Sequence, residues 1–310
     1  MKNAGVEVGG VTLPLDLSAA ASVVRPRTAA FISLTKLRLN SLVVATVAVG
    51  YCLGANARVD LAAIVSTLVG AALVAAGAAG LNQVSERDTD RVMWRTRNRP
   101  LPERRLSPSD AVVFSAVLSA AGLLLLATGA NLLAAGIALA TLVSYSAVYT
   151  PLKRRSTAAA LVGAVPGALP PVIGWAAARG SLSIEAWTLF LIVFVWQVPH
   201  LLAIASMYRD DYARAGFPVL PVMEPDGRRT GRQVVLCAAA LMPISIIPVL
   251  IHLAGPWYGA GALALGTGLF ALSVGFARDR TIGRARQLFF GSIIYLPLLW
   301  GLLIANRVAS

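Results

Sequence analysis

Long apolar segments dominate this sequence and constrain what it can fold into. Nine of them are long enough to cross a lipid bilayer, because a helix needs about 20 residues for one crossing. Charged residues make up only 13% of the chain, whereas soluble domains contain about a quarter. We therefore expect an all-α polytopic membrane bundle whose spans lie near residues 37–55, 60–84, 109–127, 131–149, 158–178, 185–205, 234–253, 257–276 and 288–305.

Many of these segments are rich in Gly and Ala, as in AALVAAGAAG at 71–80. Small residues let helix backbones approach one another closely in a bilayer, where no hydrophobic force drives helices together. This pattern favours a tightly packed bundle. An alternative, which the sequence leaves open, is that the pattern reflects only an alanine-rich composition.

The positive charges test this arrangement, since cytoplasmic loops of membrane proteins carry an excess of Lys and Arg. The chain has 27 Lys and Arg residues and a formal net charge of +13. With the N-terminus inside, all of them fall on the inner side except Arg58, Arg179 and Arg307. We therefore expect a multi-pass protein of a bacterial inner membrane, with a cytoplasmic N-terminus and an outer C-terminus. Cations that lie between apolar runs argue against nucleic-acid binding, which needs basic residues on a soluble body.

The inner side also carries the two longest connections, at 85–108 and 206–233, and long loops in compact proteins tend to be functional. The first 30 residues lack a clean apolar signal segment, because Asp16 interrupts the best candidate. We expect residues 1–34 to form a flexible cytoplasmic tail and residues 35–310 to form the transmembrane domain.

The first polar cluster lies at the inner end of the second span. Asn82, Glu86 and Asp90 are spaced four residues apart, which places them on one face of a helix. Oxygen ligands stacked in this way suit Mg²⁺, which takes carboxylates together with phosphate oxygens and water. Arginines at 91, 95, 97 and 99 follow, and guanidinium groups match phosphate geometry. The cluster therefore indicates a diphosphate site. An ordinary charged loop whose arginines extend toward the membrane surface is the alternative.

Two further clusters share the inner side. Lys153, in YTPLKRRST at 149–157, could reach a diphosphate, although such a basic run also serves as a topological anchor. Asp210 and Asp211 follow the sixth span, and His200 lies inside it. An ionisable side chain within a membrane is costly and suggests a function, whereas a lone helical histidine is often only a packing residue.

These segments carry a resemblance to a known family. The stretches NQVSERDTDRVMWRTRNRPLP, YTPLKRRS with PGALPPVIGW, and WQVPH with DYARAGFPVLPV resemble the UbiA superfamily of intramembrane prenyltransferases, and within it the protoheme IX farnesyltransferase, or haem O synthase, branch. The likeness runs from about Thr35 to the last span. The chain departs from the superfamily pattern at Gln83 and Glu86, where aspartates are usual, and at Leu37, where a proline is usual. Gln83 and Glu86 at these positions are similar to what this branch of the superfamily carries.

The resemblance implies a bundle of nine helices around a cavity that the two long inner loops cap. It implies transfer of farnesyl from farnesyl diphosphate to a vinyl group of haem B, with water added, to give haem O for terminal oxidases. The expected partners are these two substrates, membrane lipid and a haem A synthase. The expected site comprises catalytic and Mg²⁺-binding Asn82, Glu86, Asp90 and Asp211, catalytic Lys153, diphosphate ligands Lys36, Arg38, Arg95, Arg99 and Lys153, and the haem contact His200.

Other functions remain open at this point. One is a related prenyltransferase that acts on an aromatic quinone precursor. A secondary transporter is less consistent with the sequence, because transporter sites lie near the bilayer midplane and the acidic residues here lie at inner helix ends. A non-catalytic haem-binding scaffold would not need paired acidic and arginine clusters.

Overall fold

A computed structural model describes residues 7–8, 11–12, 27–55, 60–224 and 226–308, and within these ranges the chain is almost entirely helical. The exception is a pair of two-residue strands, β1 (Glu7–Val8) and β2 (Val11–Thr12), which pair antiparallel. The predicted all-α membrane class is confirmed. Within the described ranges, nine helical units are long and apolar enough to cross a membrane.

Six of these units are single long helices, one is a very long helix, and two are composite. The single ones are α2 (Leu37–Gly54), α4 (Pro108–Gly129), α9 (Ile184–Met207), α12 (Arg228–Leu250), α13 (Pro256–Asp279) and α14 (Ile282–Ala305). The longest is α3 (Leu61–Val92). The composite units are Leu132–Leu152, made of α5 (Leu132–Val143), a π-helical segment η1 (Ser144–Tyr149) and α6 (Thr150–Leu152), and Ala159–Arg179, made of α7 (Ala159–Ala168) and α8 (Pro170–Arg179).

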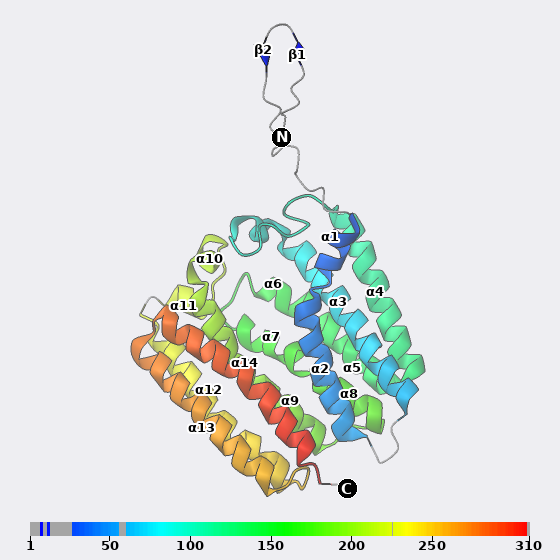
Figure 1. Cartoon of the computed structure of the whole chain (residues 1–310), viewed down its shortest axis with the longest axis vertical. Coiled ribbons are helices and arrows are strands. Elements are labelled where there is room, and N and C mark those ends of the chain that lie inside the picture. The colour runs from blue at the N-terminus through cyan, green and yellow to red at the C-terminus, as the bar shows by residue number, and fades with distance from the viewer. Residues whose placement is uncertain (1–6, 9–10, 13–26, 56–59, 225, 309–310) are drawn as a thin grey trace.

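Figure 1 shows how the units surround one another. The pairs α3–α4, α12–α13 and α13–α14 pack side by side, α2 packs on α8, and α9 contacts both α12 and α14. The short helices α1 (Arg27–Leu34), α10 (Arg209–Arg214) and α11 (Leu220–Met223) lie with α6 toward the end of the bundle that is uppermost in the figure. The helix α14 ends at Ala305 at the opposite end of the bundle. The odd number of membrane-crossing units among the described residues places α1 and the end of α14 at opposite ends.

Several helices extend beyond the predicted apolar boundaries. The helix α3 continues to Val92, so the predicted loop 85–108 begins eight residues later than expected. Likewise α12 and α14 begin six residues before the predicted spans, at Arg228 and Ile282. The physical reason is that hydropathy finds the membrane core, whereas a helix with polar termini continues into the aqueous layer. The polar residues of α3 therefore lie on a rigid helix.

The segment predicted as a flexible tail also contains a helix. The helix α1 buries Ala30 and Leu34 against Leu101, Leu106 and Ala111, which belong to the loop after α3 and to α4. Residues 27–34 are therefore packed rather than free. The rest of the predicted tail lies outside the described residues apart from β1 and β2.

The predicted close approach of helices through small residues occurs where α2 crosses α8. A Cβ atom added to Gly174 would lie 1.9 Å from the carbonyl oxygen of Val47, and one added to Gly50 would lie 1.9 Å from that of Pro171. Both distances are far below van der Waals contact. The two backbones can therefore touch only because neither position carries a side chain.

We expect Gly174→Ala to lower the thermal stability of the detergent-solubilised protein. The added methyl group would push two backbones apart, and overpacking of this kind costs about 1–3 kcal/mol. Gly136→Ala in α5 is the matched control, since nothing lies within 4 Å of the Cβ that it would add. That control should be neutral or slightly stabilising, because Ala is the better helix former. Equal unfolding temperatures for the two variants would contradict this account of the α2–α8 contact.

Candidate functional site

Three polar side chains share one buried face near the end of α3. Asp60 caps the start of this helix, and its carboxylate accepts hydrogen bonds from the backbone N–H groups of Ala62 and Ala63 at 2.9 and 3.2 Å. Near its other end, Asn82, Glu86 and Asp90 are only 3%, 5% and 1% exposed. The spacing in the sequence thus predicted their common face correctly, and the structure shows that this face is buried.

Each of these three side chains meets a cation from a different part of the chain. The Nζ atom of Lys153 lies 2.9 Å from Oε1 of Glu86, and a guanidinium nitrogen of Arg99 lies 2.7 Å from Oδ2 of Asp90. Lys36 Nζ donates to Oδ1 of Asn82 at 3.5 Å. Two buried carboxylates are therefore neutralised by two cations, and a third cation lies beside them. We call this set of six residues the polar site.

Local backbone geometry brings the cations to the polar site. Lys36 adopts the left-handed conformation, φ 48°, between α1 and α2, which few residues other than glycine adopt without cost. Lys153 directly follows the π-helical segment and α6, where Pro151 has no N–H group to donate to the preceding turn. Such π-helical turns are often found at functional sites. Arg99 lies in the tight turn that follows α3.

The site also contains two neighbouring residues, one polar and one aromatic, that the sequence did not single out. Thr150 lies 3.3 Å from Nδ2 of Asn82 and donates its hydroxyl to the carbonyl of Tyr145 at 2.8 Å. Lys153 lies over the ring of Phe217, with Nζ 4.7 Å from the centroid. Both residues lie inside the segments that carry the family resemblance. Their side-chain types alone gave no signal for a role.

Asp211 links the two long inner loops. Its two carboxylate oxygens accept hydrogen bonds from the backbone N–H groups of Trp94 and Arg95, at 3.2 and 3.3 Å, and it forms an ion pair with Arg214. Two guanidinium groups lie over the Trp94 ring, with the guanidinium carbons of Arg97 and Arg214 3.8 and 5.6 Å from the ring centroid. Asp211 therefore braces the loop after α3 against α10.

These contacts also affect the ionisation of Asp211. Burial opposes its charge, but the hydrogen bonds from Trp94, Arg214 and Arg95 outweigh burial and hold the pKa of this carboxyl below its usual value. Asp211 is therefore a carboxylate at neutral pH. To bind a metal ion it would have to exchange bonds that it already makes, and its metal assignment stays a prediction.

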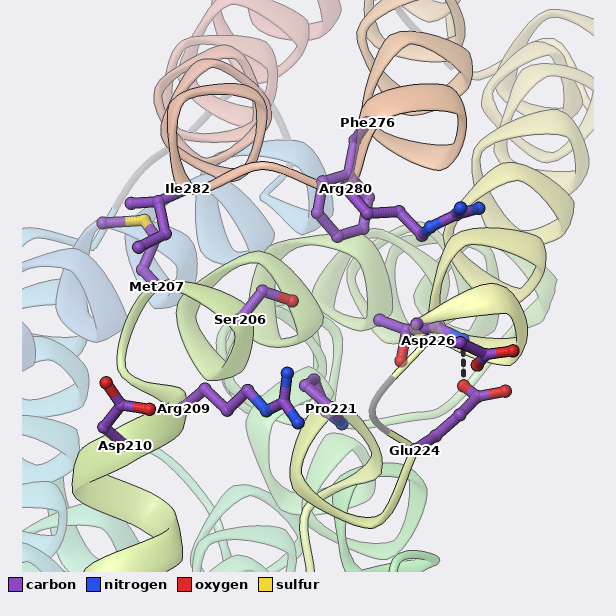
Figure 2. Close-up of a pocket in the computed structure, with 12 residues that line it drawn as sticks. Ser206, Met207, Arg209, Asp210, Pro221, Glu224, Asp226, Phe276, Arg280 and Ile282 are labelled. Carbon is purple, nitrogen blue, oxygen red and sulfur yellow. Dashed lines mark hydrogen bonds between the residues drawn. The ribbon is translucent and has the colours of Figure 1, made fainter.

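Asp210 lies in a different hollow from the polar site. Figure 2 shows a separate hollow of about 250 Å³ between the ends of α9, α12, α13 and α14, lined by Asp210, Arg209, Glu224 and Asp226 among others. The carboxylate of Glu224 accepts hydrogen bonds from the first amides of α12, at Arg229 and Thr230. The two consecutive aspartates thus have different surroundings, and only Asp211 is tied to the loop that follows the polar site.

Two of the predicted diphosphate ligands lie apart from the polar site. Arg38 is exposed in the first turn of α2, and its guanidinium forms no hydrogen bond or ion pair with the described residues. Arg95 is exposed and lies over the ring of Tyr208, with its guanidinium carbon 5.4 Å from the centroid. Of the predicted set, the structure gathers Lys36, Arg99 and Lys153. The roles of the other two stay predictions.

His200 occupies a contact between α9 and α14. Its ring stacks between Trp196 and Phe289, with centroids 4.9 and 5.1 Å away, and its Nδ1 lies 2.8 Å from Oγ of Ser292. No partner for Nε2 is found within the described residues. The imidazole is therefore held in one orientation, and its Nε2 has no hydrogen-bond partner among the described residues. Its role toward haem stays a prediction.

The donor set of the polar site fits Mg²⁺. Within the part of the chain that the structure describes, no group of three or more His, Cys, Asp and Glu side chains lies together. Mg²⁺ does not require one, because it is usually held by one or two carboxylates, with substrate phosphate oxygens and water as the remaining ligands. Glu86, Asp90 and the amide oxygen of Asn82 supply such a set on one rigid face.

A small hollow opens next to the polar site. It has a volume of about 300 Å³ and is lined by Tyr149 and Lys153 on one side and by apolar residues of α9, such as Leu201 and Ile204, on the other. Its lining is mostly apolar. An amphiphilic ligand with a charged head and a hydrocarbon chain would fit these surroundings.

Comparison with known proteins places the chain among enzymes. Residues 43–305 match the model of the UbiA prenyltransferase family. The chain is 46% identical over 286 residues to the protoheme IX farnesyltransferase of Solibacter usitatus, covering 89% of this chain and 98% of the relative.

Solved structures of low sequence identity share the fold. A digeranylgeranylglyceryl phosphate synthase superposes with a TM-score of 0.77 at 16% identity, covering 90% of this chain and 98% of that one. A UbiA homologue from Archaeoglobus fulgidus bound to GPP and Mg²⁺ superposes with a TM-score of 0.63 at 17% identity, covering 89% and 99%. At these identities the likeness concerns the fold alone.

Proposed function

Because this chain belongs to the UbiA prenyltransferase family, we propose that it transfers the farnesyl group of farnesyl diphosphate to a vinyl group of haem B. Water adds in the same reaction, and the product is haem O. The identity to a protoheme IX farnesyltransferase over nearly the whole chain supports this activity. Family membership also removes the secondary transporter from the alternatives.

The observation that carries the proposal is the polar site. Two buried carboxylates and an amide lie on one face of α3, and Lys36, Arg99 and Lys153 surround them. This combination of acidic ligands and cations is what a metal-bound diphosphate requires. The relative from Archaeoglobus fulgidus was solved with GPP and Mg²⁺, which supports the same ligand class for this chain.

The three cations have a direct role in this mechanism. The bond between the farnesyl group and the diphosphate oxygen breaks, and negative charge grows on the departing diphosphate. Lys36, Arg99 and Lys153 stabilise that charge, and fixed charges in a site shielded from water are usually the largest contribution to catalysis. A vinyl carbon of haem B then bonds to the farnesyl carbon. The neighbouring vinyl carbon takes up hydroxide from water, and a proton is released.

Mg²⁺ held by Glu86, Asp90 and Asn82, with Asp211 as a further candidate, would add positive charge beside the diphosphate oxygens. In the structure Lys153 and Arg99 neutralise the two carboxylates. We infer that bound Mg²⁺ would supply this neutralisation instead, so that Lys153 and Arg99 would be free to pair with the diphosphate. The buried charges would then remain balanced.

The pKa of Lys36 predicts an alkaline limb in the pH profile. Burial, together with the nearby charges of Arg99 and Lys153, lowers the pKa of Lys36 to about 8. Below that pH the side chain is charged and attracts the diphosphate, and above it the charge is lost. We expect kcat/KM for farnesyl diphosphate to fall as the pH rises through about 8, since this ratio reports ionisations of the free enzyme.

Lys36→Arg is the matched variant for this measurement, because a guanidinium stays charged throughout the range. In that variant the fall near pH 8 should disappear, whatever the absolute rate. If kcat/KM of Lys36→Arg still falls near pH 8 as in the wild type, a group other than Lys36 causes the fall.

The topology yields another expected result. We propose that the end of the bundle with the polar site faces the cytoplasm, because the cations gather there. Reporter domains fused after residue 130 or 180 should then read as outside, and those fused after 103 or 226 as inside. A reversed reading at any two of these four sites would refute this orientation.

Activity can be tested directly with the purified protein. Incubation with haem B, farnesyl diphosphate and Mg²⁺ should give a product whose mass exceeds that of haem B by one farnesyl group and one hydroxyl group. A parallel reaction with an aromatic quinone precursor as acceptor tests the related prenyltransferase activity. Prenylation of that acceptor without any haem product would refute the proposal in favour of the quinone-type reaction.

A further inference from the structure

A second charged hollow lies beside the polar site but on another face of α3. It has a volume of about 390 Å³ and is formed by the end of α3, the loop before α4 and the first residues of α4. Three arginines line it, Arg87, Arg91 and Arg104, and its one acidic side chain is Asp88. The lining therefore carries a net charge of +2. The mechanism proposed above uses none of these residues.

The position of Arg87 and Arg91 separates this hollow from the polar site. Each follows one of the inward-facing carboxylates by one residue, which on an α-helix is a rotation of about 100°. Glu86 and Asp90 are buried, whereas Arg91 is exposed and Arg87 is half-buried, with 43% of its side chain exposed. Two anion-attracting surfaces therefore lie on neighbouring faces of the same helix.

Arg104 completes the group through a strained turn. Its backbone adopts the left-handed conformation, φ 57°, in a turn closed by hydrogen bonds from its own N–H to the carbonyl of Leu101 and from Arg105 to Pro100, at 3.1 and 2.8 Å. Such a conformation costs free energy for a residue with a side chain. Here it brings a third guanidinium to a hollow that already holds two.

The three guanidinium groups have few partners of their own. Asp88 lies 3.6 Å from a nitrogen of Arg87 and 3.6 Å from a nitrogen of Arg91, and both distances are longer than a hydrogen bond. The side chains of Arg87, Asp88 and Arg91 are each more than two-fifths exposed. No side-chain hydrogen bond of Arg87, Arg91 or Arg104 occurs within the described ranges. Most of their N–H donors are thus free for a ligand.

We propose that this hollow, the Arg87–Arg91–Arg104 site, binds a phosphate-bearing anion distinct from the prenyl substrate. Planar guanidinium groups pair with two phosphate oxygens at once, and three of them around one hollow match a phosphate group. Such an anion has two sources at this end of the bundle, the headgroup of an anionic phospholipid and free phosphate. Basic pockets at the cytoplasmic ends of transmembrane helices are typical lipid headgroup sites.

The test compares two triple variants that lose the same charge. Arg87→Gln/Arg91→Gln/Arg104→Gln removes the site, whereas Arg155→Gln/Arg278→Gln/Arg286→Gln removes three exposed arginines of the same end that do not line the hollow. Each protein is delipidated in detergent, and binding is measured by native mass spectrometry with phosphatidylglycerol, phosphatidylcholine or inorganic phosphate as the added probe. Thermal unfolding of both variants checks that they are folded.

We expect phosphatidylglycerol to bind the first variant about a hundredfold more weakly than the wild type, since each arginine near a membrane surface contributes about a fivefold factor. The second variant should bind like the wild type. If inorganic phosphate instead shows the selective loss, the site binds free phosphate. Equal losses in both variants, or equal binding of phosphatidylcholine and phosphatidylglycerol, would overturn the proposal. Should the triple variant fail to fold, Arg104→Gly tests the same site, because glycine tolerates the turn.

Discussion

Replacing Glu86 by Ala or Gln, or Asp90 by Ala or Asn, should lower the turnover number at least about a thousandfold. These carboxylates are the proposed metal ligands, and losing one should raise the barrier by at least about 4 kcal/mol. They are the only two carboxylates of the polar site, buried next to Lys153 and Arg99, so no third carboxylate there can replace a lost one. Steady-state turnover with haem B and farnesyl diphosphate at saturating Mg²⁺ is the measurement.

The ion pairs make the choice of substitution important. Alanine at residue 86 or 90 would leave Lys153 or Arg99 without its partner, and an unpaired buried charge can cost about 3–5 kcal/mol of stability. Glutamine and asparagine keep the shape and a hydrogen-bond acceptor while they remove the charge. Loss of activity in the amide variants, with the unfolding temperature close to that of the wild type, would therefore report on catalysis rather than folding.

Asp279→Asn is a suitable control for these variants. Asp279 also forms an ion pair, with Arg284 at 2.9 Å, but it is exposed at the end of α13 and far in sequence from the polar site. Its turnover should match that of the wild type. Near-normal turnover in Glu86→Gln or Asp90→Asn would remove the metal assignment of that residue.

The sequence predicted the parts of the site that depend on local periodicity. The spacing of Asn82, Glu86 and Asp90 gave their common face, because a four-residue spacing nearly matches one helical turn. The nine spans likewise follow from the length and polarity of the apolar runs, which the bilayer thickness determines. Where a helix continues past its apolar segment, as α3 does, hydropathy does not show where the helix ends.

Contacts between side chains far apart in the sequence could not be predicted from the sequence alone. Lys153 and Glu86 are 67 positions apart, and His200 and Ser292 are 92 positions apart. Such contacts depend on how whole helices cross, which no local pattern encodes. Asp211 illustrates the consequence, since its residue type suggested a metal ligand, yet in the structure it accepts hydrogen bonds from the backbone of the other loop.

His200 should matter for haem binding much more than for binding of farnesyl diphosphate. It lies in α9 seven residues before that helix ends at Met207, or about 10 Å along the helix axis, and Asp211 follows in the separate helix α10, which is too far for His200 to join a metal site built around Asp211. Its Nδ1 is hydrogen-bonded to Ser292, which leaves Nε2 available. Metal-binding histidines commonly use one ring nitrogen for the metal and the other for an orienting hydrogen bond, and imidazole is a usual axial ligand of haem iron.

His200→Ala and His200→Phe together separate ligation from packing. Phenylalanine keeps an aromatic ring between Trp196 and Phe289 but cannot bind iron, so both variants should bind haem B at least about tenfold more weakly and shift its Soret absorption. Farnesyl diphosphate affinity should stay within about twofold of the wild type in both. If His200→Phe binds haem normally and only His200→Ala does not, the histidine serves packing. If haem affinity is unchanged while diphosphate affinity collapses, His200 belongs with the residues that bind the diphosphate and has no role toward haem.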